Sequence, residues 1–113
     1  MLKGALAERI ETIRERGGIN SREVAQLLET TPQTVSRWQT GRSSPHPRSL
    51  DRLLKLEWIA QLLSEFYTPE EAKLWLFSPH RQLEGARPAD LISEDRMDEV
   101  LALIDQIQSG AYA

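Results

Sequence analysis

Apolar residues recur at helical spacing along nearly the whole chain, and no stretch shows the strict alternation of a half-buried β-strand. The first stripe contains Leu6, Ile10 and Ile13, whose side chains would share one face of a helix. It stops at Gly17 and Gly18, because glycine readily adopts the left-handed conformation that ends many helices. The pattern predicts an all-α fold, and it contains no internal repeat.

Two short helices are predicted after this glycine pair. Ser21 is a candidate N-cap for a helix over residues 22–28, since its hydroxyl can accept a hydrogen bond from the first turn. Thr31 is the candidate N-cap of the next helix, with Pro32 at the first helical position, where a missing backbone N–H costs nothing. This second helix is predicted to end at Gly41.

Three further helices are predicted in the rest of the chain. Residues 42–49 are interpreted as a linker, because their two prolines cannot donate backbone hydrogen bonds. A long amphipathic helix follows over residues 50–67, and Thr68 begins another that runs through Phe77. Ser93, with the two acids that follow it, is predicted to cap a final helix. The apolar residues of that helix are Val100, Leu101, Leu103, Ile104 and Ile107.

The segment between Ser21 and Gly41 has the pattern of a helix-turn-helix, in which the second helix can enter the DNA major groove. Ala25 is small enough to let the two helices approach closely. Trp38 is interpreted as a core residue, because it follows Val35 at helical spacing. The apolar residues that would face one another across the motif are Val24, Ala25, Leu28, Val35 and Trp38.

The exposed face of the second helix is predicted to contact DNA. Gln and Arg side chains pair with adenine and guanine edges, Thr and Ser hydroxyls bind phosphates, and further Arg residues add sequence-independent charge. The candidate DNA-binding residues are Gln33, Thr34, Ser36, Arg37, Arg42 and Arg48. The alternative is that they form only the polar face of an amphipathic helix. Because one motif binds weakly, a dimer on a two-fold operator is expected.

In TVSRWQTGRSSP, residues 34–45, the sequence resembles the Xre/Cro family of helix-turn-helix domains. The resemblance covers residues 8–56, about half of the chain, and implies that this segment is the recognition helix with the loop that follows it. Glu29 and Thr30 occupy the turn, where the family usually has glycine and an apolar residue.

Residues 75–92, WLFSPHRQLEGARPADLI, hold apolar anchors at irregular intervals. Pro79, Gly85 and Pro88 would force turns between these anchors, with Gly85 at positive φ and Pro88 opening a short helix. The pattern predicts a compact corner that acts mainly as a scaffold for the last helix.

At this corner the sequence resembles the C-terminal domain of the MbcA/ParS/Xre antitoxins, over residues 54–113. His80 stands where that family often has asparagine. The residues that carry the resemblance are Trp75, Leu76, Pro79, Leu83, Glu84, Gly85, Pro88, Ala89, Asp90, Leu91, Gly110, Ala111 and Tyr112.

The combined resemblance implies a type II antitoxin whose gene lies beside that of a RES-domain toxin, an enzyme that destroys NAD. It implies that the chain neutralises this toxin by binding it, within a complex that holds several copies, and that the complex represses its own promoter. Residues 1–48 would then form the DNA-binding domain and residues 49–113 the toxin-binding domain.

The last helix and the tail are the predicted toxin-binding part. An aromatic ring with a hydroxyl, on a lead of small residues, suits a mostly apolar cofactor pocket with one polar partner. We therefore expect residues 110–113 to enter or cover the NAD cleft of the toxin; the alternatives are simple docking and a dispensable tail. The candidate toxin-binding residues are Ile104, Ile107, Gly110, Ala111, Tyr112 and Ala113.

Charge is divided unevenly along the 113 residues. Residues 1–50 contain eight Lys or Arg and five Asp or Glu, whereas residues 51–113 contain six and twelve, which gives +3 and −6 and the total of −3. A basic half for DNA and an acidic half for a protein partner fit these numbers, although a simple solubilising surface fits them equally. The lack of cysteine, of a signal-peptide pattern and of a long apolar run predicts a cytoplasmic protein without a membrane partner.

No pattern of catalytic residues is present, so an enzymatic role, a metal site and a cofactor are not expected. His46 and His80 are the only histidines, and neither has a nucleophile or metal-ligand spacing beside it. Two other functions remain open at this stage. The chain could be a stand-alone transcription regulator, or a toxin-binding protein whose altered turn has lost DNA binding.

Overall fold

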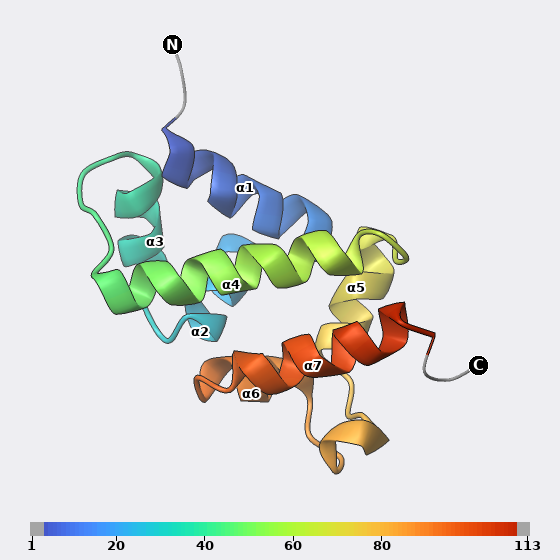
Figure 1. Ribbon diagram of the computed structural model, residues 1–113. Helices are drawn as coiled ribbons and strands as arrows, with labels where there is room; N and C mark the ends of the chain where they lie inside the picture. Colours follow the sequence, from blue (N-terminus) through green and yellow to red (C-terminus); the bar gives the residue numbers. More distant parts are fainter. Residues whose placement is uncertain (1–3, 111–113) are drawn as a thin grey trace.

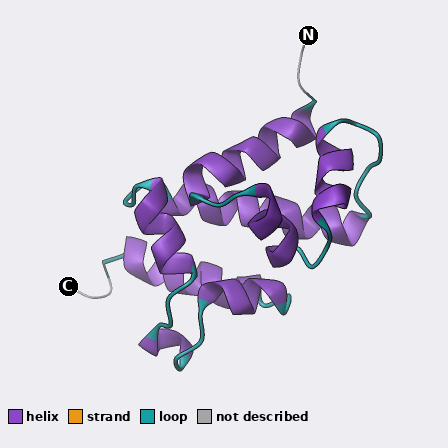
Figure 2. Cartoon of the chain, turned by 180° about the vertical axis from the view of Figure 1, so that it is seen from behind, coloured by secondary structure: helices purple, strands orange, loops and turns teal. Residues whose placement is uncertain are grey.

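The computed structural model describes residues 4–110, and over that range every regular element is a helix (Figures 1 and 2). The predicted all-α fold is confirmed. The α-helices are α1 (Ala5–Gly17), α2 (Ser21–Leu27), α3 (Pro32–Gln39), α4 (Pro47–Leu63), α5 (Pro69–Leu76), α6 (Pro88–Ser93) and α7 (Met97–Gln108), with a short 3₁₀ helix at Arg81–Leu83.

Helix α4 crosses the middle of the molecule and contacts both halves of it (Figure 1). Helix α1 packs along one side of α4 and α7 along another, while α2 packs against α3 and α6, α3 against α1, and α6 against α7. Buried apolar side chains from all seven helices form a single core. The domain boundary predicted between residues 48 and 49 lies within the first turn of α4, so that helix belongs to both halves of the core.

Of the two N-cap residues predicted in the first half, one is confirmed and one is corrected. Thr31 caps α3, and its hydroxyl accepts a hydrogen bond from the backbone N–H of Thr34. Helix α2 is capped by Asn20, whereas Ser21, the predicted cap, is the first helical residue. Asn20 prevails because Glu23 then falls at the position whose carboxylate accepts from the cap backbone N–H, which completes a capping box.

Two later helix boundaries differ from the prediction. Helix α4 begins at Pro47, three residues before the predicted start, because a proline at the first helical position has no hydrogen bond to lose. The same helix ends at Leu63, since the residues after it form a turn before Thr68 opens α5 with a second capping box. Helix α7 begins at Met97 without a side-chain cap, and Ser93, its predicted cap, is the last residue of α6.

A close approach of backbone joins the end of α1 to the start of α5. Gly18 follows α1 in the left-handed region at φ 66°. A Cβ atom at this position would lie 2.1 Å from the carbonyl oxygen of Pro69. Gly18 therefore combines two requirements for glycine, a positive φ and the absence of a side chain.

A buried arginine on α4 ties the two halves together. Arg52 is only 8% exposed, and its Nη2 donates hydrogen bonds to the carbonyl oxygens of Ile92 at 2.9 Å, Ser93 at 3.2 Å and Leu27 at 3.4 Å. These carbonyls lie at the ends of α6 and α2, where helix carbonyls lack partners within the helix. Asp95 adds an ion pair with the Nε of Arg52 at 3.6 Å.

Candidate DNA-binding face and partner-binding half

The helix-turn-helix turn contains a non-glycine residue in a glycine-like conformation. Glu29 has φ 55°, and the backbone N–H of Thr30 donates to the carbonyl of Ala25 at 2.8 Å, which closes the end of α2. Val24, Ala25 and Val35 are buried, as predicted for the contact between the two helices. The left-handed turn therefore forms here although no glycine is present.

We expect Glu29→Gly to stabilise the protein by about 0.5–1 kcal/mol. A non-glycine residue in the left-handed conformation costs about 1–2 kcal/mol, and glycine removes this strain. About half of the gain is offset, because glycine loses more backbone entropy on folding. Urea unfolding followed by circular dichroism measures the difference. Glu29→Ala is the control: it removes the same charge but keeps a Cβ atom, so no such gain is expected. Equal gains from both variants would assign the effect to the charge.

Helix α3 buries one face and exposes the other. Val35 and Trp38 are in the core, which confirms the interpretation of Trp38 as a core residue. Gln33, Ser36 and Arg37 lie on the exposed face. A shallow hollow open to solvent runs over this face, and the residues that line it are Pro32, Gln33, Ser36, Arg37, Thr40 and Arg42.

The structure brings four of the six candidate DNA-binding residues together in this hollow and leaves two outside it. The Thr34 hydroxyl is half-buried and lies 3.0 Å from the hydroxyl of Thr31, within the cap of α3. Arg48 is on α4 and donates to the Asp95 carboxylate at 3.0 Å. The remaining four, Gln33, Ser36, Arg37 and Arg42, line the hollow together, and their side-chain types are those that contact base edges and phosphates in protein–DNA complexes.

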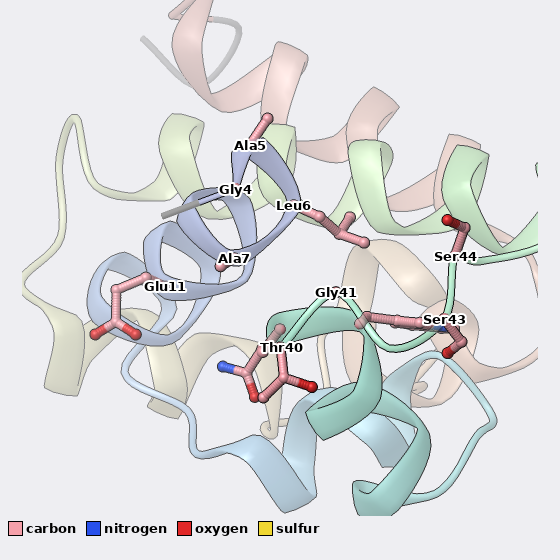
Figure 3. Close-up of a pocket in the computed structure, with 11 residues that line it drawn as sticks. Gly4, Ala5, Leu6, Ala7, Glu11, Thr40, Gly41, Ser43 and Ser44 are labelled. Carbon is pink, nitrogen blue, oxygen red and sulfur yellow. The ribbon is translucent and has the colours of Figure 1, made fainter. Parts of the chain in front are cut away.

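A second hollow lies between the start of α1 and the loop that follows α3. In Figure 3 the Leu6 side chain extends from α1 toward the loop that carries Gly41 and Ser44, while Glu11 lies further along the same helix. Small and polar residues make up most of its lining, and Glu11 is the one ionisable group among them. We assign no chemistry to this hollow.

The two histidines differ in their surroundings. His80 Nε2 lies 2.8 Å from the carbonyl oxygen of Trp75, and the two rings are 4.8 Å apart. His46 is exposed immediately before α4. Between residues 4 and 110 no group of three or more His, Asp or Glu side chains is arranged to hold a metal ion. No helix in the same range is long and apolar enough to cross a membrane.

The corner over residues 75–92 has the predicted form. Gly85 is at φ 86°, and Pro88 opens α6. Glu84 before this glycine is also left-handed, at φ 57°, a feature that the sequence did not reveal. At the start of α6, hydrogen bonds from the Arg87 guanidinium hold the pKa of the Asp90 carboxyl below its usual value.

The predicted toxin-binding residues fall into three groups. Ile104 is fully buried in the core, so it supports α7 from within and has no surface to offer a partner; that prediction is corrected. Ile107 is half-buried against the core, and Gly110 is exposed at φ 74° after the end of α7. Ala111, Tyr112 and Ala113 lie outside the described residues.

Large apolar side chains that the sequence analysis did not single out are exposed in two places. Leu74 on α5 is 69% exposed, and Phe66 is 38% exposed in the turn between α4 and α5. The other group follows one ridge of α4 at a spacing of four residues. It consists of Leu50, Leu54 and Trp58. The sequence pattern missed both groups because apolar residues at helical spacing are read as core.

Two family models together match nearly the whole chain. A helix-turn-helix domain matches residues 5–56, and the antitoxin Xre/MbcA/ParS C-terminal toxin-binding domain matches residues 62–110. The residues of the first match include those that line the hollow over α3, and the residues of the second match include α5, α6 and α7.

Relatives and a solved structure match over similar lengths. The mycobacterial cidal antitoxin MbcA of Mycobacterium tuberculosis is 36% identical over 95% of each chain, as is MbcA of Mycobacterium bovis. A probable mycobacterial cidal antitoxin of M. tuberculosis is 34% identical over 84% of this chain and 81% of its own length. A chain in the crystal structure of the M. tuberculosis MbcT–MbcA toxin–antitoxin complex matches with a TM-score of 0.83 and 34% identity, over 97% of this chain and 99% of its own. This chain belongs to the Xre/MbcA/ParS antitoxin family.

Proposed function

We propose that this protein neutralises a RES-domain, NAD-degrading toxin by direct binding, and that it represses its own operon through the helix-turn-helix. The observation that carries the proposal is the nearly full-length likeness to a chain of a toxin–antitoxin complex. The family resemblance supplies the RES identity of the partner. The first half supports the DNA-binding part, because α3 exposes a polar face with Arg37, Arg42 follows it in the same hollow, and the turn before α3 is closed by a hydrogen bond.

Co-expression with a RES-domain toxin tests the central claim. We expect the tagged toxin to retain this chain on an affinity column, and cells that make both proteins to keep their NAD. The expected complex contains several copies of each chain, which light scattering measures. Full NAD loss in the presence of this chain, without a complex, would leave a stand-alone regulator as the better description.

Arg37→Ala is expected to weaken binding to the promoter of this gene by about 1–3 kcal/mol and to relax its sequence preference. The reason is the position of Arg37 on the exposed face of α3, where its guanidinium can pair with a guanine edge. Fluorescence anisotropy with promoter and scrambled duplexes measures both effects. Arg81→Ala removes the same charge from an exposed site in the second half and should leave affinity unchanged. Equal affinities for Arg37→Ala and the wild type would show that Arg37 does not contribute to DNA recognition.

A variant that ends at Ser109 tests whether the tail blocks the toxin. If residues 110–113 cover the NAD cleft, binding should survive in part while inhibition of NAD loss falls sharply, because the rest of the surface still docks. The measurement compares inhibition at equal occupancy of the toxin, with occupancy taken from calorimetric titration. Full inhibition by the shortened chain at equal occupancy would show that the tail is not the block.

A further inference from the structure

The most exposed large apolar residue in the described range belongs to a small patch at the junction of α4 and α5. Leu74 lines an open, mostly apolar hollow together with Tyr67, Trp75 and His80. The Tyr67 ring meets the Phe66 ring edge-on, with centroids 4.9 Å apart. Phe66, Tyr67 and Leu74 therefore form one continuous surface, which we call the junction patch.

We propose that the junction patch is a docking surface for the toxin. This inference rests on the proposed function and adds the surface that does the binding. Exposure of an isolated leucine is ordinary in a small protein, but a leucine that is 69% exposed beside two aromatic rings and a hollow is typical of a binding site. The patch also lies within residues 62–110, which match the toxin-binding family model.

The end of α7 lies beside this patch, which makes the toxin the best-supported occupant. Gln108 Nε2 donates to the carboxylate of Glu65 at 3.3 Å, and Glu65 directly precedes Phe66. The chain therefore passes into its last residues at the edge of the junction patch. A partner that receives residues 110–113 must approach this edge, and its surface around the receiving cleft would then cover Phe66 and Leu74.

The charge around the patch points to the same partner. Glu71 lines the hollow, Glu65 is at the α7 side, and Glu70 is exposed in the first turn of α5. The nearest lysine in this stretch, Lys73, is paired with Glu23 at 3.2 Å. A cleft that binds the pyrophosphate of NAD presents positive potential from helix N-termini or basic side chains, so an acidic rim complements the surroundings of such a cleft.

The test uses the full-length chain and the RES-domain toxin that retains it in the co-expression experiment, with affinity measured by calorimetry. Leu74→Ser and Phe66→Ser should each weaken binding about tenfold or more, because both side chains would sit in the centre of the interface. Leu74→Ser should leave the melting temperature unchanged, since Leu74 is 69% exposed. Phe66 is 38% exposed and contacts the Tyr67 ring, so Phe66→Ser should lower the melting temperature, and its affinity is measured well below that temperature. A lower association rate at high salt is also expected from the acidic rim.

Leu50→Ser is the matched control. Leu50 is 37% exposed, against 38% for Phe66, and lies near the other end of α4, thirteen residues or about 20 Å from Leu63. It should bind the toxin within about twofold of the wild type, well below the loss at a hot spot. Equal losses in the control and the patch variants, or unchanged affinity in the patch variants, would overturn the docking surface while leaving the proposed function intact.

Two other outcomes separate the proposals. If the wild-type chain does not bind the RES-domain protein at all, the proposed function fails and the docking surface fails with it. If Leu74→Ser abolishes self-association in sedimentation experiments but keeps toxin affinity, the patch joins copies of this chain, and the docking surface is overturned alone.

Discussion

Gly18→Ala is expected to lower the free energy of unfolding by about 3 kcal/mol or more. The left-handed backbone at φ 66° costs any residue with a Cβ atom about 1–2 kcal/mol. The new Cβ would also sit 2.1 Å from the Pro69 carbonyl oxygen, so the start of α5 must move away from α1. Because small domains have about 5–15 kcal/mol of stability in total, the variant should unfold far more readily in urea.

Gly17→Ala provides the control for this prediction. Gly17 is buried next to the half-buried Gly18, but it is helical, and a Cβ there would meet its nearest neighbour at 3.7 Å, an ordinary contact. Its expected effect runs from neutral to a gain of about 1 kcal/mol, because alanine favours the helix over glycine. If the two variants unfold at the same urea concentration, the contact between α1 and α5 does not constrain the fold.

Trp75→Ala is expected to cost about 3–5 kcal/mol, the range for deleting a large aromatic side chain from a core. Trp75 is 8% exposed and packs within the core, and its ring and carbonyl oxygen both contact His80. Its loss should disorganise the corner over residues 75–92. Thermal melting followed by circular dichroism measures the effect, and toxin binding should fail together with folding.

Leu74→Ala, one residue away on the same helix, separates core from surface. Because Leu74 is mostly exposed, its truncation should leave the melting temperature unchanged. A Trp75→Ala protein that melts like the wild type but no longer binds toxin would contradict the scaffold role and make Trp75 an interface residue.

Local rules were sufficient for most helices and for the helix-turn-helix. Thr31 with Pro32, and Thr68 with Glu71, start helices by chemistry that is complete within a few residues, and the structure confirms both starts. The capping error at Ser21 was avoidable, since Glu23 stands three residues after Asn20 and so favours Asn20 as the cap. Pro47 was predicted to lie in a linker because proline disrupts the interior of a helix. In the structure it is the first residue of α4, a position where proline is favoured.

Contacts between distant segments were beyond the reach of the sequence. Spacing placed Ile104 on a helix but could not show which face of that helix the core would cover. Nor could it show that Gly18 meets Pro69, because that contact depends on how α1 and α5 cross. The exposed face of α3 was predictable in advance, since a helix-turn-helix fixes its own buried side, although DNA contact by that face stays a prediction.

The Arg52 guanidinium has a consequence for how antitoxins of this kind could exchange parts. It sits on α4 and pairs with the α6 carbonyls of Ile92 and Ser93 within residues 49–113, whereas the Leu27 carbonyl at the end of α2 depends on an arginine from the other half. A chimaera that transplants residues 1–48 alone would separate the α2 carbonyl from the arginine that it needs. An exchange limited to the exposed positions of α3 would leave this contact between the two halves in place.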